Sequence, residues 1–410
     1  MLFGGAARRK GRVGRVPNIT IKHLDSLDAL RDAAPAWNAL WQRSEIRLPT
    51  ARAELLALWC KSFAPGQLFR ALLIEQNGQL VAALPLLEAR WLGQRTGSLP
   101  GNHWSSAGDF LLDPSSNVER VCDALVVALQ DQACPLLRFE GLAGDADHWR
   151  AFCDALDRQH LTFARRHRFT IDLVRVAGEW EEYFASRSRN HRRHIRQSRQ
   201  RAEREGDIVL TTLDDLAPDA VESFLRTCFE IENDGWKGAT RSAVLSVPGV
   251  WDFYLEQARQ LAAWGQLRIV LLRNSGRPIA YEYGWLSKGA YFSLKVGYDE
   301  AFRHLTPGQL LRAQLIERSF SEGLVDWIDF FGPASDATSK WATDQYCVDR
   351  LVIANRGTFA RCLVGAYRHA WPLVHRIVGT PRARANPARA LRKQGVAGCE
   401  GAIATFPADA

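Results

Sequence analysis

Apolar positions recur along the first ninety residues with two periods, in some segments that of a β-strand and in others that of an α-helix. The predicted strands lie at 18–24, 69–75 and 80–91. The predicted helices lie at 26–44 and 52–63. Asn77-Gly78 separates two of the strands, and Asn-Gly between apolar runs is a strong signal for a tight β-hairpin. The pattern therefore predicts a mixed α/β (α+β) fold.

The hairpin recurs later in the chain. Residues 70–82 align with residues 268–280, 198 positions further on, and Gly78 matches Gly276. Each copy continues with a loop, a helix and a strand in the same order. The helices are 118–129 and the helix that runs to Phe320; the strands are 136–139 and 327–331. The shared order predicts a tandem duplication into two mixed α/β domains.

A chain of 410 residues is long enough for two or three domains with cores of their own. The predicted organisation has two domains between basic or flexible ends. Its parts are a disordered basic tail (1–17), a first domain (18–165), a second domain (168–355), a basic helical extension (356–394) and a disordered tail (395–410).

The most informative stretch runs from residue 277 to residue 320, where two strands and a basic turn lead into a helix. The helix opens on Thr306-Pro307-Gly308, which combines an N-cap residue, a first-turn proline and a glycine that admits close approach to the backbone. Unpaired N–H groups at such an end attract phosphate, and Arg303, His304 and Arg312 add positive charge. The alternative is an ordinary capped helix. The first domain has Asp113-Pro-Ser-Ser-Asn117 here, so an anion site is expected in the second domain.

Composition excludes several classes of protein. An apolar content of 47% with 24% charged residues is typical of a soluble globular protein, and no apolar run approaches the length of a membrane span. The eight cysteines form no CxxC pair and no zinc spacing with histidine, so they are expected to be reduced and no metal is expected. The motifs GxGxxG, Walker A, HExxH and GxSxG are absent. The net charge of +8 suits an anionic ligand without specifying which.

Four segments together resemble the GNAT superfamily of N-acyltransferases, and more narrowly the CelD/BcsL-type acetyltransferases, which share a double-GNAT plan with the FemAB enzymes. The segments are the Arg-rich run 188–196, Glu232-Asn-Asp-Gly-Trp236-Lys237-Gly238, the stretch 276–308, and Asp329-Phe-Phe-Gly332-Pro with Lys340-Trp341 beyond. The resemblance implies tandem GNAT-like domains, each a mixed, mostly antiparallel sheet flanked by helices. The first domain resembles the family's degenerate copy.

The resemblance also implies acetyl-CoA or another acyl-CoA as the co-substrate. The expected cofactor-binding residues lie on the strand before the helix and around the helix start. They are Val296, Gly297, Arg303, His304, Thr306, Pro307, Gly308, Gln309 and Arg312. Backbone N–H groups near Val296 and Gly297 would bind the thioester carbonyl if the strand splays there, and a glycine inside a strand suits such a splay. A single Gly308 replaces the usual glycine-rich pyrophosphate loop.

Direct attack by an amine also needs a group that removes a proton. The candidates for catalysis are Glu282, Asp299 and Lys340. Counting back from the turn at 287–290 sets Glu282 opposite Lys295, so a structural ion pair is the alternative for Glu282. Loop capping is the alternative for Asp299, and a solvated loop position is the alternative for Lys340.

On the acceptor side, Trp236, Lys237 and Tyr298 are expected to line the substrate site, unless the tryptophan fills the core at a helix end. The expected reaction is acyl transfer to an amine, on an amino sugar or another envelope or polysaccharide precursor. Two other functions remain open. One is a FemAB-like transfer from aminoacyl-tRNA, and the other is a double-GNAT scaffold that binds a ligand without catalysis.

Two basic segments bear on partners. The helix 187–204 carries eight arginines and two histidines, which suits the phosphates of a ligand; nucleic acid is not expected, because no aromatics interleave with the arginines. The second segment, 358–378, mixes apolar residues with arginine and histidine. It predicts a helix that either lies on an anionic membrane face or docks on the protein. A cytoplasmic location is expected, with contact to the inner membrane only in the first case.

Overall fold

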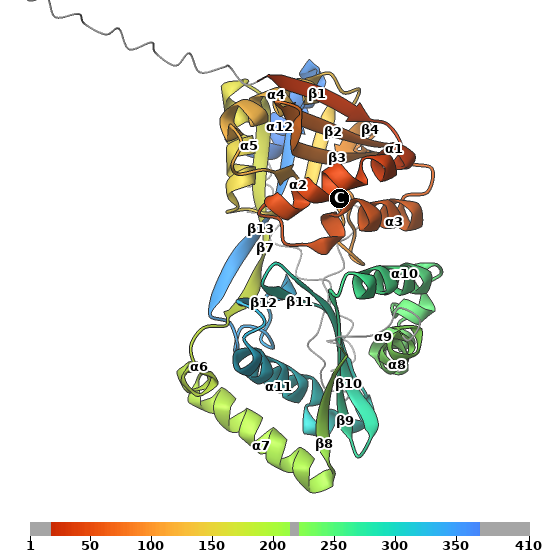
Figure 1. Cartoon of the computed structure of the whole chain (residues 1–410), viewed down its shortest axis with the longest axis vertical. Coiled ribbons are helices and arrows are strands. Elements are labelled where there is room, and N and C mark those ends of the chain that lie inside the picture. Colours follow the sequence, from red (N-terminus) through yellow and green to blue (C-terminus); the bar gives the residue numbers. More distant parts are fainter. Residues whose placement is uncertain (1–17, 214–220, 370–410) are drawn as a thin grey trace, which may run out of the picture.

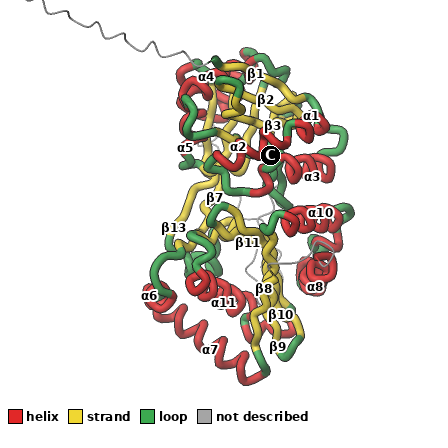
Figure 2. The backbone as a smooth tube through the Cα atoms, viewed as in Figure 1, coloured by secondary structure: helices red, strands yellow, loops and turns green. Residues whose placement is uncertain are grey.

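The computed structural model describes residues 18–213 and 221–369 and has a mixed α/β fold (Figures 1 and 2). The strands are β1 Ile19–Leu24, β2 Phe69–Gln76, β3 Gln79–Trp91, β4 Gln94–Ser98, β5 Leu111–Leu112, β6 Leu136–Ala143, β7 Thr162–Arg175, β8 Ile208–Leu213, β9 Leu267–Asn274, β10 Arg277–Ser287, β11 Ala290–Tyr298, β12 Trp327–Pro333 and β13 Asp344–Ala354.

Helices cover the strands. The α-helices are α1 Leu27–Asp32, α2 Ala34–Arg43, α3 Ala53–Phe63, α4 Val118–Gln130, α5 Asp147–Arg158, α6 Trp180–Ser186, α7 Arg189–Glu205, α8 Val221–Asp234, α9 Trp236–Ala239, α10 Val250–Ala263, α11 Pro307–Glu322 and α12 Thr358–His369. The 3₁₀ helices are η1 Pro49–Ala51, η2 Val244–Ser246 and η3 Glu300–Leu305.

The strands form a single sheet in the order β1-β2-β3-β4-β6-β13-β7-β12-β11-β10-β9-β8, with β5 beside β3. Each end of the sheet repeats one plan. An antiparallel run (β1-β2-β3-β4 or β8-β9-β10-β11) is followed by a helix (α4 or α11) and then by a strand parallel to the last one (β6 or β12). The element order predicted from the repeated hairpin is therefore present in both halves. Figure 1 shows two lobes joined by β7 and β13.

The two lobes share strands. β13 pairs with β7 along its whole length and with β6 from Val348 to Ala354, whereas β7 pairs with β12 near its own end. The predicted division between residues 165 and 168 thus falls inside β7, and β13, which was predicted to belong to the second domain, borders β6. We call β1–β6, α1–α5 and α12 the first lobe, and α6–α11 with β8–β12 the second lobe.

Both predicted hairpins form with the same turn geometry. Asn77 and Gly78 have φ of 55° and 82°, and Ser275 and Gly276 have φ of 46° and 84°. Two successive left-handed residues define the tight turn whose twist matches that of the flanking strands, which is why glycine occupies the second position in each copy.

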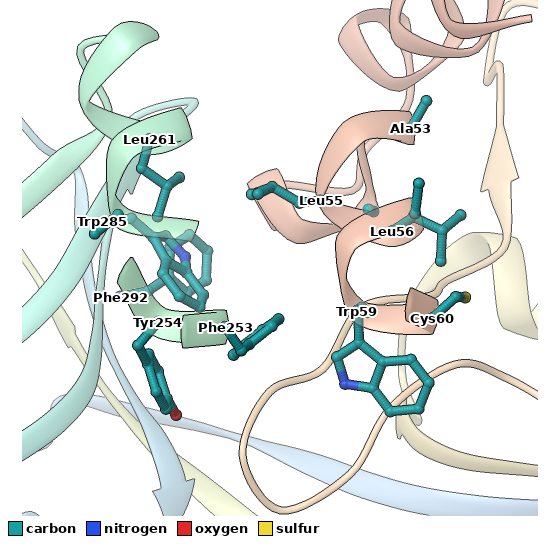
Figure 3. Packing of buried hydrophobic residues seen from close by; sticks show 14 of the residues in the cluster. Ala53, Leu55, Leu56, Trp59, Cys60, Phe253, Tyr254, Leu261, Trp285 and Phe292 are labelled. Carbon is teal, nitrogen blue, oxygen red and sulfur yellow. The ribbon is translucent and has the colours of Figure 1, made fainter. Parts of the chain in front are cut away.

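Apolar packing holds the lobes against each other. One hydrophobic cluster extends from α3 of the first lobe to α10, β10 and β11 of the second, and Figure 3 shows side chains of α3 and α10 facing each other. The rings of Phe63 and Phe253 lie 4.6 Å apart in an edge-on arrangement. The Lys288 ammonium donates hydrogen bonds to first-lobe carbonyls, among them that of Ser44 at 2.9 Å. These contacts fix the first lobe over one face of the second-lobe sheet.

The described part of the basic C-terminal segment docks on the protein. Ala360 and Val364 of α12 are buried against β7 and β13. Residues 358–369 therefore dock on the protein, which was one of the two predicted arrangements of this segment. The rest of the predicted extension and both predicted tails lie outside the described residues. Among the residues described, no helix combines the length and the apolarity needed to cross a membrane.

Candidate active site

Strands β11 and β12 diverge after a short parallel contact. Pairing covers Ala290 to Phe292 on β11 and Trp327 to Asp329 on β12. β11 carries a bulge, because Tyr283 pairs with Lys295 but the next residue of β10 pairs with Ser293. We call β11 beyond Phe292 and β12 beyond Asp329 the splay. A splay was expected near Val296 and Gly297, and the two strands part four residues earlier.

Helix α11 starts at the open end of the splay. A Cβ atom added to Gly308 would lie 3.7 Å from the Tyr298 ring, at the end of β11. On the other side, Gln309 and Arg312 donate hydrogen bonds to the Ala337 carbonyl, which follows β12, at 3.4 and 3.3 Å. The first two turns of α11 therefore contact the end of β11 and the loop that follows β12.

The helix start differs from the predicted cap. Thr306 does stand at the N-cap position and Pro307 in the first turn, but Thr306 has φ 53° and ψ 53° and its side chain does not cap the helix. Its hydroxyl instead donates to Ser198 Oγ of α7 at 2.8 Å. The Gly308 N–H finds no acceptor among the described residues. An unpaired N–H remains at this helix end, as an anion site requires.

Basic groups from α7 and from the loop after β12 surround this end of α11. Arg201 donates to the His304 carbonyl, and the His304 ring lies 2.7 Å from a Glu205 carboxylate oxygen. Burial lowers the pKa of His194, and the charges of Lys340 and Arg201 lower it further. Burial, followed by Lys340, likewise lowers the pKa of His191 to about 4. Lys340 is thus close to α7, and Arg303 lies on η3 beside His304.

Two of the predicted cofactor residues have structural partners. Gln309 Oε1 accepts from the Trp341 indole at 3.0 Å, and Trp341 is fully buried. Arg312 is 8% exposed, and its guanidinium lies 4.7 Å from the centre of the Phe330 ring. Burial lowers the pKa of Arg312, while Glu282 raises it. These side chains attach α11 to the sheet, whereas a phosphate ligand would need an exposed cation.

Glu282 does not oppose Lys295. The bulge in β11 shifts the register, so Glu282 pairs with Val296 and its side chain lies on the α11 face of the sheet. It accepts a hydrogen bond from the Tyr291 hydroxyl at 2.9 Å, and it is 1% exposed. Burial raises the pKa of Glu282, and the nearby charge of Arg312 opposes the rise. The predicted Glu282–Lys295 pair was wrong.

The remaining residues near the turn are held by local contacts. Asp299 accepts from the Ala301 N–H at 2.9 Å, which caps η3, and from Arg277 at 2.5 Å. Asp299 therefore has the capping contact that was the alternative to a catalytic role.

Gly297 lies under the Tyr281 ring, and a Cβ atom at residue 297 would come within 2.4 Å of that ring.

A buried charged cluster occupies the opposite face of the second-lobe sheet. Lys237 donates to Glu232 at 2.7 Å, and Lys295 lies 3.9 Å from the same carboxylate. The Lys295 ammonium also lies 4.9 Å from the centre of the Trp104 ring, which belongs to the first lobe. Burial lowers the pKa of Lys295 to about 8, and Glu232 opposes the shift. Trp236 begins α9 beside this cluster.

Two groups were missed as site candidates. Lys295 was assigned only to a structural pair, and Asp329 was quoted within a motif without a role. Asp329 is buried on β12 where the splay begins, and burial raises its pKa to about 6. The Tyr346 hydroxyl donates to it at 3.1 Å. Its position in the Asp-Phe-Phe-Gly run was the signal in the sequence.

These features define two GNAT-like lobes that share one sheet, with a splayed strand pair and a helix N-terminus in the second lobe. Residues 189–340 match the family model described as an acetyltransferase (GNAT) domain. The second lobe therefore holds a segment that matches the GNAT acetyltransferase domain.

Solved structures agree on the fold. A conserved protein of unknown function from Bacteroides thetaiotaomicron is 13% identical, with a TM-score of 0.52, over 82% of this chain and all of that one. FemX is 11% identical, with a TM-score of 0.50, over 84% of this chain and 98% of that one. No curated protein matches the sequence. At these identities the likeness concerns the fold, and it covers both lobes.

Proposed function

We propose that the second lobe binds an acyl-CoA, most simply acetyl-CoA, and transfers its acyl group to an amine. The observation that carries the proposal is the start of α11, which contacts the end of β11 and the loop after β12 and leaves the Gly308 N–H without an acceptor among the described residues. The pyrophosphate would bind there, near Arg201 and Lys340. A helix N-terminus and nearby cations both favour phosphate.

The remaining parts of the reaction follow from the splay. The acyl arm would lie between β11 and β12, where N–H groups near Val296 and Gly297 would bind the thioester carbonyl. The amine then attacks the carbonyl carbon, the C–N bond forms and the C–S bond breaks. The acceptor class proposed is an amino sugar or another precursor of the envelope or of a polysaccharide, reached in the cytoplasm or at its membrane surface. Lys237, Trp236 and Tyr298 remain the proposed contacts for it.

Calorimetric titration with acetyl-CoA tests the donor site, with Gly308→Asp as the blocking variant. Aspartate in the first turn favours a helix, and a Cβ atom at residue 308 makes only an ordinary contact, so the variant should fold. Its carboxylate would repel the pyrophosphate, and binding should be lost. The matched control is Asn117→Asp, which adds the same charge to the start of α4 and keeps the cap on the Arg120 N–H.

Micromolar binding that is lost in Gly308→Asp and kept in Asn117→Asp supports the site. Equal loss in both variants would instead indicate a general effect of charge. Absence of binding by the unmodified protein rejects the acyl-CoA donor.

A second candidate is transfer from aminoacyl-tRNA, in keeping with the FemAB resemblance. The supporting observation is the row of exposed arginines along α7, which includes Arg189, Arg193, Arg196 and Arg204. If the donor is charged tRNA, replacing Arg193 and Arg196 by alanine should weaken tRNA binding in a filter assay. It should also lower the salt dependence of binding, because fewer phosphates are neutralised. Tight acetyl-CoA binding without any acyl transfer would instead favour the third function, a double-GNAT scaffold that binds a ligand without catalysis.

A further inference from the structure

Asp329 is a buried carboxylate that forms no ion pair within the described part of the chain. It is 7% exposed, and no basic side chain of the described residues lies within 4.0 Å of its carboxylate. Its oxygens accept from the Phe331 N–H at 2.7 Å and from the Tyr346 hydroxyl at 3.1 Å. The charged groups that face it are Arg47 of the first lobe and, through Tyr346, Asp109. Burying an unpaired charge is costly, so the position calls for an explanation.

A structural role alone does not require an acid here. An asparagine amide would accept the same Phe331 N–H through its oxygen and would pair with the Tyr346 hydroxyl through its nitrogen. It would shape the same bend in β12, where Phe331 has φ 50°, without burying a charge. The carboxylate therefore adds the ability to take up and release a proton.

The position of Asp329 relative to the splay is specific. It pairs with Phe292 as the last partner before β11 and β12 part, so it stands at the closed end of the splay, opposite the end that α11 covers. Paired residues of neighbouring strands share a face, and Phe292 belongs to the cluster that faces α10 and the first lobe. Asp329 thus faces away from α11 and Glu282, and Tyr346 and Phe331 beside it are partly exposed.

We infer that Asp329 is the proton acceptor of the acyl transfer, with the amine reaching the closed end of the splay from the first-lobe face. The inference rests on the proposed function. The donor's phosphates would lie at the α11 end, its acyl arm would run between the strands, and the thioester would reach the region that Asp329 borders.

The proton balance is complete without another reactant. The acceptor arrives as an ammonium, and the Asp329 carboxylate takes one proton from it. The free amine attacks the thioester carbonyl carbon, forming the C–N bond, and the C–S bond breaks to release a thiolate. The amide nitrogen loses its second proton to that thiolate, and Asp329 later returns its own proton to water.

The test compares the whole protein with Asp329→Asn, Tyr346→Phe and the control Asp131→Asn, which replaces an exposed carboxylate of the first lobe. Acetyl-CoA binding is measured by calorimetry. Thiol release from acetyl-CoA is then followed from pH 5 to pH 8.5, with glucosamine as the probe amine and with water alone.

We expect Asp329→Asn to bind acetyl-CoA within threefold of the unmodified protein and to lose roughly 10²- to 10⁴-fold in turnover. The acidic limb of its pH profile should disappear. In Tyr346→Phe that limb should move to higher pH, because the hydroxyl that stabilises the ionised carboxylate is gone. A residue that only shapes the bend would produce neither change in the profile.

Turnover by Asp329→Asn close to that of the unmodified protein would overturn the inference, as would a slower reaction whose acidic limb stays in place. Thiol release that stays absent in the unmodified protein, despite bound acetyl-CoA, also counts against it, since a base here should activate at least water. Failure of the unmodified protein to bind acetyl-CoA is a different result, because it rejects the proposed function itself.

Discussion

Replacing Asp329 by asparagine should stabilise the protein at neutral and basic pH. The substitution keeps the size of the side chain and both hydrogen bonds, to the Phe331 N–H and the Tyr346 hydroxyl. It removes a buried charge that has no cation within 4.0 Å among the described residues. Active-site groups of this kind often reduce the stability of the fold for the sake of reactivity.

The magnitude follows from the shift in pKa. Burial raises the pKa of Asp329 from 3.8 to about 6, so the folded state binds the proton more tightly than the unfolded state does. The stability that protonated Asp329 provides is therefore complete below about pH 4 and is lost as the pH rises through 6. At about 1.4 kcal/mol per pH unit, ionisation costs about 3 kcal/mol at pH 8, and this cost is what asparagine avoids.

The assay is denaturant unfolding of both proteins at pH 4, 6 and 8, with the difference in unfolding free energy taken at each pH. The advantage of Asp329→Asn should grow by about 2–3 kcal/mol between pH 4 and pH 8. Other titrating groups cancel, because both proteins contain them. A difference that stays constant across this range would show that the carboxylate ionises as easily in the folded chain as in the unfolded one.

Three further stability predictions follow from buried contacts. Gly297→Ala should cost roughly 1–3 kcal/mol because its Cβ would meet the Tyr281 ring, whereas Gly308→Ala should change the unfolding free energy by less than about 0.5 kcal/mol. Glu232→Gln should cost about 3–5 kcal/mol, because two buried lysines lose their counter-ion. Lys295→Met should be neutral or stabilising at pH 7, since burial lowers that lysine's pKa from 10.5 to about 8; the gain should close toward pH 10. Urea unfolding measures all three, and equal losses for the two glycine variants, or a gain for Lys295→Met that persists at pH 10, would contradict them.

Local signals predicted the elements well. The Asn-Gly turn, the second hairpin and the helix at Pro307 depend on neighbouring residues, and each forms where the pattern placed it. The repeat then predicted the order of hairpin, loop, helix and strand along the chain in each lobe. The strand β13 shows the limit, because it lies between β6 and β7 through pairings that local periodicity does not encode.

The site was harder to predict because it depends on register and on distant partners. A one-residue bulge at Leu294 moved Lys295 from Glu282 to Glu232, since an extra residue shifts the strand by one place and turns every later side chain to the other face. Asp329 gained its raised pKa from burial, and its hydroxyl partner Tyr346 lies on another strand. Neither the burial of Asp329 nor its hydrogen bond with Tyr346 could be predicted from the sequence alone.

The two lobes differ most where a ligand would bind, which explains why only one carries the proposed site. In the first lobe the start of α4 is capped by Asn117, whose side chain accepts from the Arg120 N–H. In the second lobe Thr306 turns its hydroxyl to α7 and leaves the start of α11 without such a cap. The start of α4 thus has a side-chain cap that the start of α11 lacks. The Trp104 carbonyl of the first lobe meanwhile accepts from Tyr254 beside Lys295. The first lobe therefore covers the face of the second lobe on which the acceptor is proposed to bind, a role that needs its fold but no ligand of its own.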